Sequence, residues 1–150
     1  MVLQPIISVA TVVERSKAFL FVEETVKSRL VINQPAGRLE VGESLVSAAA
    51  REALEETGWT IEPRGLVGIY RWSSEREGKT YVRVCFYGHA LQHDAQRPLD
   101  KGIERVVWLD HTALLQRVQD LRSPLVLRCV DDFLAGRRFP LDLLVDLPQS

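Results

Sequence analysis

Hydrophobic and polar positions alternate along much of the chain in a way that predicts many short strands. Residues 6–13 are rich in β-branched side chains, and residues 18–23 follow after a polar turn, so these two segments should form a β-hairpin. The loop-forming run Asn33-Gln34-Pro35-Ala36-Gly37 and the polar segment 92–102 interrupt the pattern. Strands are predicted at residues 6–13, 18–23, 30–32, 66–72, 80–90 and 105–109.

Helices are predicted where capping residues border longer apolar periods. Serine and aspartate are favourable N-caps, proline suits the first helical position, and glycine ends helices. The predicted helices run from Ser44 to about Thr57 with a stop at Gly58, from Asp110 to Arg117, and from Ser123-Pro124 to Ala135 with a stop at Gly136. Because strands outnumber helices and the first connection is a hairpin, we expect an α/β (α+β) fold in one domain, residues 1–150, with a mixed sheet sandwiched between helices.

Composition narrows the class of protein. The chain has 150 residues, 46% of them hydrophobic and 26% charged, with a formal net charge of −1, which is typical of one globular domain. This near-neutral balance argues against recruitment of a nucleic acid polymer or an acidic membrane. Two cysteines, Cys85 and Cys129, are too few for a disulfide scaffold and are predicted to be buried thiols. No signal peptide and no membrane span of about 20 apolar residues is evident, so we expect a cytoplasmic protein.

The stretch AGRLEVGESLVSAAAREALEETGW, residues 36–59, carries the candidate chemistry. At about 100° per residue, Glu52 and Glu56 lie about 40° apart around the helix, and Glu55 lies about 60° to the other side of Glu52. Like charges at this spacing destabilise a helix by a few tenths of a kcal/mol per pair, so folding alone does not favour them. Two interpretations follow: a solvated helix face, or a set of carboxylates that holds a metal, with Arg51 orienting them.

The spacing around these acids resembles a family signature. Gly37, five residues, Glu43, seven residues, and then REALEETGW from Arg51 to Trp59 match every fixed position of the Nudix box. The chain is therefore identified as a member of the Nudix hydrolase family. The resemblance implies a Nudix-type α/β/α sandwich and hydrolysis of a nucleoside diphosphate linked to another moiety, or of related phosphoanhydrides.

The resemblance also implies residue roles. Glu52, Glu55, Glu56 and the Gly37 carbonyl correspond to metal ligands, with Mg²⁺ as the cofactor and Mn²⁺ as a possible substitute. Glu43 and Arg51 correspond to residues that orient these ligands. Glu52 is the first candidate for the general base, with Asp100 and Glu104 as alternatives because some members use an acid from a distant loop.

Three further motifs are similar to those of the bacterial NudJ-type phosphatase subgroup: NQPAGRLE (33–40), LRSPLV (121–126) and FPLDLL (139–144). That likeness implies release of orthophosphate from nucleoside tri- and diphosphates, and action on hydroxymethylpyrimidine pyrophosphate. Ala36 stands where the common loop has glycine, and Ile32 stands where an aromatic residue is common.

Substrate recognition outside the Nudix box is weakly encoded. Trp72, Tyr81, Arg83 and Glu104 are the candidate substrate-binding residues, since aromatic rings stack on a base and arginine binds phosphate. The alternative for each aromatic is a place in the core. We expect a small phosphorylated substrate, no nucleic acid polymer, no membrane, and a monomer or homodimer. Three alternatives stay open: a catalytically silent Nudix-fold binding module, an enzyme acting on RNA or mRNA caps, and a pyrophosphatase for oxidised nucleotides, nucleotide sugars or dinucleotides.

Overall fold

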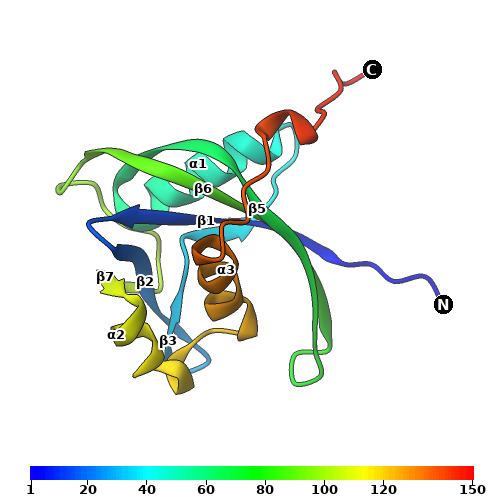
Figure 1. Cartoon of the computed structure of the whole chain (residues 1–150). Helices are drawn as coiled ribbons and strands as arrows, with labels where there is room; N and C mark the ends of the chain where they lie inside the picture. The colour runs from blue at the N-terminus through cyan, green and yellow to red at the C-terminus, as the bar shows by residue number, and fades with distance from the viewer.

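A seven-stranded mixed sheet lies between two helices in the computed structural model, which describes residues 1–150 (Figure 1). The elements are β1 (Ile6–Arg15), β2 (Ala18–Val26), β3 (Arg29–Asn33), β4 (Ala36–Arg38), α1 (Leu45–Thr57), β5 (Trp59–Ser74), β6 (Lys79–His93), β7 (Ile103–Asp110), α2 (His111–Leu115), η1 (Val118–Asp120), α3 (Pro124–Leu134) and η2 (Leu141–Leu143).

Strand β1 joins two parts of the sheet. It pairs in parallel with β6 over its length and antiparallel with β4, whereas it meets β2 only beside their turn, at Glu14↔Phe19 and Arg15↔Ala18. Ser16 and Lys17 make this turn with φ values of 50° and 67°. Beyond the turn β2 pairs with β3 and β7 instead, so the sheet divides into β4-β1-β6-β5 and β3-β2-β7.

The core has one layer on each side of β1, because successive side chains of a strand face opposite ways. Helix α1 packs its alanines Ala48 and Ala49 against Val9 of β1. Helix α3 contributes Val126, Cys129, Val130 and Phe133 to a larger cluster that contains Ala10 and Val12. The predicted α/β/α sandwich with a mixed sheet is confirmed, and both cysteines are buried as predicted.

Several strands extend beyond their predicted limits, and β4 was not predicted. Strand β5 begins at Trp59, directly after the end of α1, whereas the sequence predicted a strand only from residue 66. The sequence did not predict this early start because proline is unusual inside a strand. Pro63 is tolerated here because the β5–β6 register shifts between Pro63 and Gly65. Strand β6 continues to His93, into the predicted polar segment. Strand β4 falls in the predicted loop, where Ala36 pairs with Ala10 of β1.

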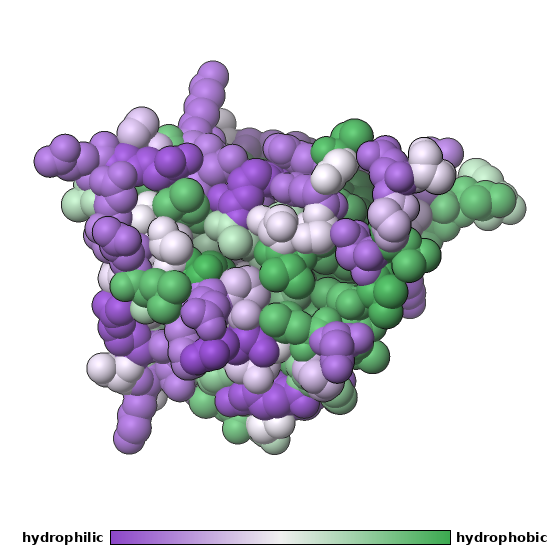
Figure 2. All heavy atoms as spheres, turned by 90° about the horizontal axis from the view of Figure 1, so that it is seen from above, coloured by the Kyte–Doolittle hydropathy of each residue, from purple (hydrophilic) through white to green (hydrophobic).

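The surface is unevenly apolar. Figure 2 shows hydrophilic residues over most of one side of the upper face and hydrophobic residues toward the other, where Figure 1 places both chain termini. Exposed apolar side chains of the terminal segments include Met1, Val2, Val145 and Leu147. None of the helices has the length and apolar character needed to cross a membrane.

Candidate metal and active site

Helix α1 presents the acidic side chains, and its sequence explains its limits. The Ser44 hydroxyl accepts a hydrogen bond from the Ser47 backbone N–H at 3.1 Å, so one of the free donors of the first turn is satisfied. Gly58 ends the helix in the left-handed region, with φ of 75°, and donates its N–H to the Leu54 carbonyl at 2.9 Å. The helix therefore forms where capping residues predicted it.

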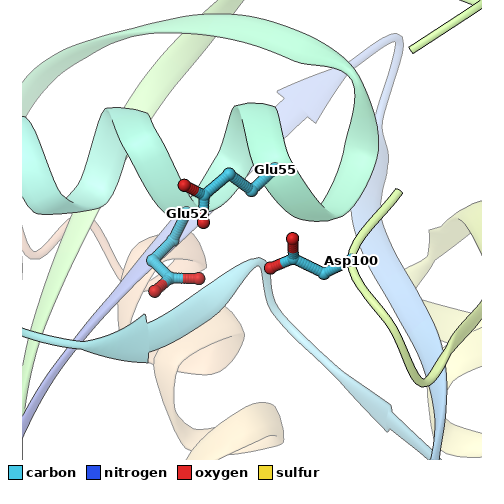
Figure 3. Close-up of side chains that lie close together, drawn as sticks. All are labelled: Glu52, Glu55 and Asp100. Atoms are coloured by element: carbon cyan, nitrogen blue, oxygen red, sulfur yellow. The ribbon is translucent and has the colours of Figure 1, made fainter. Parts of the chain in front are cut away.

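Three carboxylates converge at the last turns of this helix. Oxygens of Glu52, Glu55 and Asp100 lie within 4.8 Å of one another, and Figure 3 shows the three groups pointing toward a common point. Asp100 comes from the segment between β6 and β7, which crosses the end of α1. The Asp100 N–H donates to the Glu55 carbonyl at 3.0 Å, and the Asp94 N–H donates to the Gly58 carbonyl at 2.9 Å. These backbone bonds fix Asp100 beside the helical acids.

The Arg51 guanidinium holds this cluster together. It donates to both oxygens of Glu43 at 2.8 and 2.7 Å, to Glu52 Oε1 at 2.9 Å and to Glu55 Oε2 at 3.1 Å. It also donates to the Arg38 carbonyl at 3.1 Å. The hydrogen bonds from Arg51 hold the pKa of Glu43 below its ordinary value. The predicted orienting contacts of Arg51 and Glu43 are therefore present.

Gly37 allows β4 to approach the Glu52 side chain. A Cβ atom at position 37 would lie 2.1 Å from the Glu52 carboxyl carbon, which no side chain can accommodate without displacing the carboxylate. Burial raises the pKa of Glu52 above its ordinary value, and the negative charges of Glu55 and Asp100 raise it further against the opposing effect of Arg51. The carboxylate is thus placed against backbone and beside like charges.

Glu56 occupies a more enclosed place than the other acids. Its Oε1 accepts a hydrogen bond from the Ala36 N–H at 2.8 Å, which ties α1 to β4. Burial raises its pKa to about 9, with further contributions from the charges of Glu24, Glu52 and Asp100 and an opposing one from the Ala36 N–H. Glu56 is not one of the three acids that converge, and those three, Glu52, Glu55 and Asp100, have Arg51 as the one cation bonded among them. This donor set suits a hard divalent cation, which prefers carboxylate and carbonyl oxygens.

A cavity of about 290 Å³ adjoins the Gly37 loop and contains three of the predicted substrate-binding residues. The Trp72 and Tyr81 rings stack there with centroids 5.9 Å apart and an interplanar angle of 18°. Arg83 is only 5% exposed and donates to Gln34 Oε1 at 2.9 Å and Asn33 Oδ1 at 3.1 Å. The residues of the predicted loop therefore fix a buried guanidinium in the cavity wall.

The predicted residues do not all come together. Glu104 lies on the exposed surface of β7, accepts a hydrogen bond from the Thr25 hydroxyl at 3.0 Å, and lines neither the carboxylate cluster nor this cavity. Sequence reasoning missed Glu24, a carboxylate in the cavity wall, and Gln34, whose amide donates to the Val126 carbonyl at 2.7 Å. Glu24 lies on β2 and reaches the cavity only through strand pairing, which no local motif marks, whereas Gln34 belongs to the NQPAGRLE loop but its partners on β6 and α3 are distant in the sequence.

Known proteins resemble the chain over nearly its whole length. The sequence model of the NUDIX domain matches residues 3–129. Phosphatase NudJ of Escherichia coli strain K12 is 36% identical over 143 residues, which cover 95% of this chain and 92% of that protein. The solved NUDIX hydrolase from Nitrosomonas europaea is 41% identical, covers 96% of this chain and 98% of its own, and has a TM-score of 0.95. The NUDIX domain of Shewanella oneidensis NrtR, solved with ADP ribose, has the same fold at 17% identity, a TM-score of 0.67 and coverage of 89% and 88%.

Proposed function

Because the chain belongs to the NUDIX domain family and is a Nudix hydrolase, we propose that it hydrolyses phosphoanhydride bonds of nucleoside di- or triphosphates and related pyrophosphates, with water attacking phosphorus. The observation that carries this proposal is the convergence of Glu52, Glu55 and Asp100 within 4.8 Å. This carboxylate cluster lies beside a cavity that is large enough for a small ligand.

The metal that we assign to this cluster is Mg²⁺, with Mn²⁺ as a substitute. Nudix hydrolases depend on divalent metal ions, and the proposed ligands are Glu52, Glu55, Glu56 and the Gly37 carbonyl, joined by Asp100. When bound, the cation neutralises negative charge on the phosphate oxygens of the substrate and polarises the phosphorus under attack.

The protein's own groups supply orientation and proton transfer. Arg51 occupies Oε1 of Glu52 and leaves Oε2 without a hydrogen-bond partner. We assign proton acceptance from the attacking water to this free oxygen, because the Arg51 guanidinium holds the other oxygen of Glu52. Asp100 is the alternative base, since its carboxylate faces the same point. Glu43 acts through Arg51, because its two oxygens accept from Nε and Nη2 along one edge of the guanidinium and leave Nη1 to Glu52 and Glu55.

The substrate in this proposal is a small phosphorylated molecule with an aromatic ring. Trp72 and Tyr81 offer a stacking surface for the ring, and Arg83 offers positive charge near the phosphates. The name of the Escherichia coli phosphatase supports release of orthophosphate, and the ADP ribose bound to the NrtR domain supports a nucleotide ligand. Hydroxymethylpyrimidine pyrophosphate has the same combination of ring and diphosphate.

A substrate panel tests the proposal. Nucleoside di- and triphosphates and hydroxymethylpyrimidine pyrophosphate are incubated with the protein and Mg²⁺, and orthophosphate and pyrophosphate are quantified separately. We expect Mg²⁺-dependent release from at least one compound and its loss in Glu56→Gln. Absence of metal-dependent release from every compound, with the protein folded, contradicts the proposal and favours a binding module.

A further inference from the structure

A second and larger cavity, of about 1080 Å³, lies beside the proposed ring-binding cavity. Its wall is formed by the β2–β3 turn, the β5–β6 hairpin and the start of α3, and the turn and the hairpin tip both lie at the lower end of the molecule in Figure 1. Its charged lining is mostly basic: Lys27, Arg29, Arg71, Arg76, Arg122 and Arg128, against Glu77 and Asp131. The whole chain has a net charge of −1, so this lining concentrates positive charge locally.

Part of this charge is already neutralised within the protein. Arg122 donates to Glu77 at 2.7 Å, and Arg128 donates to the neighbouring Asp132 at 3.0 Å. The second acid of the lining, Asp131, is bound to His111 at 2.7 Å. Neither acid of the cavity lining forms an ion pair with Lys27, Arg71 or Arg76.

Three cations of the lining have no partner in the protein. Lys27, Arg71 and Arg76 take part in no side-chain hydrogen bond and no ion pair, and all three are exposed. Lys27 sits in the β2–β3 turn, Arg71 on β5 and Arg76 in the β5–β6 hairpin, so they approach the cavity from different elements. Cations converging from separate segments suit the binding of an anionic group.

The two cavities adjoin each other, because they share lining residues. Trp72, Arg122 and Ser123 line both of them, so the stacking ring of Trp72 stands at their junction. The smaller cavity in turn contains Gly37, which contacts the Glu52 carboxylate. The smaller cavity therefore lies between the carboxylate cluster and the basic cavity, with Trp72 at the border of the two cavities.

We propose that the basic cavity binds a second anionic group of the substrate, a phosphate on the sugar on the side away from the hydrolysed diphosphate. This inference rests on the proposed function, because it takes the diphosphate to lie at the carboxylate cluster and the ring beside Trp72. Lys27, Arg71 and Arg76 then bind the distal phosphate. A 3′-phosphorylated nucleotide is the simplest ligand with this arrangement.

Isothermal titration calorimetry with AMP and with adenosine 3′,5′-bisphosphate, in the presence of Mg²⁺, tests the proposal without requiring turnover. The two ligands differ only in the 3′-phosphate. We expect the bisphosphate to bind wild type about 10-fold more tightly than AMP, as one or two partly exposed charged hydrogen bonds imply. The double variant Arg71→Gln, Arg76→Gln should reduce this ratio to about 1 and change the AMP dissociation constant by less than about 2-fold.

A charge-matched control separates local binding from general attraction. The double variant Lys17→Gln, Arg64→Gln also removes two exposed cations, and neither residue lines either cavity. It should keep the wild-type ratio. Equal affinities for the two ligands in wild type, or an equal fall of the ratio in both double variants, overturns the proposal.

The substrate panel separates the two conclusions. A preserved preference for the bisphosphate without metal-dependent hydrolysis refutes the proposed function and supports the binding cavity. Hydrolysis without such a preference supports the function and overturns the cavity proposal.

Discussion

Replacing Arg51 with lysine removes the group that connects the acids while keeping its charge. Arg51 donates five hydrogen bonds from three nitrogens, and four of them reach Glu43, Glu52 and Glu55. A lysine ammonium has three donors on one atom and cannot span these positions. We therefore expect Arg51→Lys to lose the paired contact with Glu43 and the orientation of Glu52.

The size of the effect follows from burial. Buried hydrogen bonds to charged groups contribute about 1.5–3 kcal/mol each. The Arg51 and Glu43 side chains are 22% and 16% exposed, so solvent screening reduces each bond, and about 1 kcal/mol is the appropriate value. Loss of two bonds lowers the free energy of unfolding by about 2 kcal/mol. Loss of ligand orientation lowers the hydrolysis rate or the metal affinity about 10- to 100-fold.

Two assays measure these effects: urea unfolding, and initial hydrolysis rates over a Mg²⁺ titration. Arg64→Lys is the matched control, because Arg64 forms its carboxylate ion pair with exposed Glu62 at 3.0 Å, away from the cluster. A variant Arg51→Lys with the wild-type rate and wild-type Mg²⁺ half-saturation would refute the positioning role of Arg51.

Three further predictions concern the acids and the glycine around the cluster. Gly37→Ala should reduce hydrolysis at least about 10-fold, measured as kcat at saturating Mg²⁺, because the new Cβ would lie 2.1 Å from the Glu52 carboxyl carbon; an unchanged kcat contradicts the close approach. Asp100→Asn should weaken Mg²⁺ activation, whereas Glu104→Gln should leave the Mg²⁺ titration unchanged, because only Asp100 shares the cluster. Burial raises the pKa of Glu56 to about 9 from an ordinary 4.5. In EDTA, the contribution of Glu56 to the free energy of unfolding is therefore fully present below about pH 4.5 and is lost as the pH rises toward 9. Urea unfolding from pH 5 to 9 should show a steeper fall of the free energy of unfolding for wild type than for Glu56→Gln, and parallel curves contradict the raised pKa.

The local sequence was sufficient to predict the helices whose ends are marked by capping residues. Helices α1 and α3 begin after the predicted caps Ser44 and Ser123, because a side-chain acceptor at the N-cap is a local property. The early part of β5 was missed, since Pro63 and the register shifts beside it break the alternation that identifies a strand. Strand β4 was missed because its pairing with β1 depends on a distant segment.

In the site too, contacts within one local segment could be predicted, whereas contacts with a distant segment could not. The contacts of Arg51 with Glu43 and Glu55 follow from spacing along one loop and helix, so the sequence predicted them. The sequence named Asp100 and Glu104 as alternatives without separating them. Hydrogen bonds to the end of α1 fix the path of the β6–β7 segment. This path decides which of the two acids reaches the cluster.

Hydrolysis in ¹⁸O-labelled water tests whether water attacks phosphorus at a divalent metal held by this carboxylate cluster. The reaction is run with the preferred substrate from the panel, with Mg²⁺ or with EDTA, on wild type and on Glu52→Gln, and the phosphate products are analysed by mass spectrometry. We expect ¹⁸O in one phosphorus-containing product of the wild type with Mg²⁺, and almost none in EDTA or in Glu52→Gln. Labelled product formed at the wild-type rate in EDTA or by folded Glu52→Gln would contradict it.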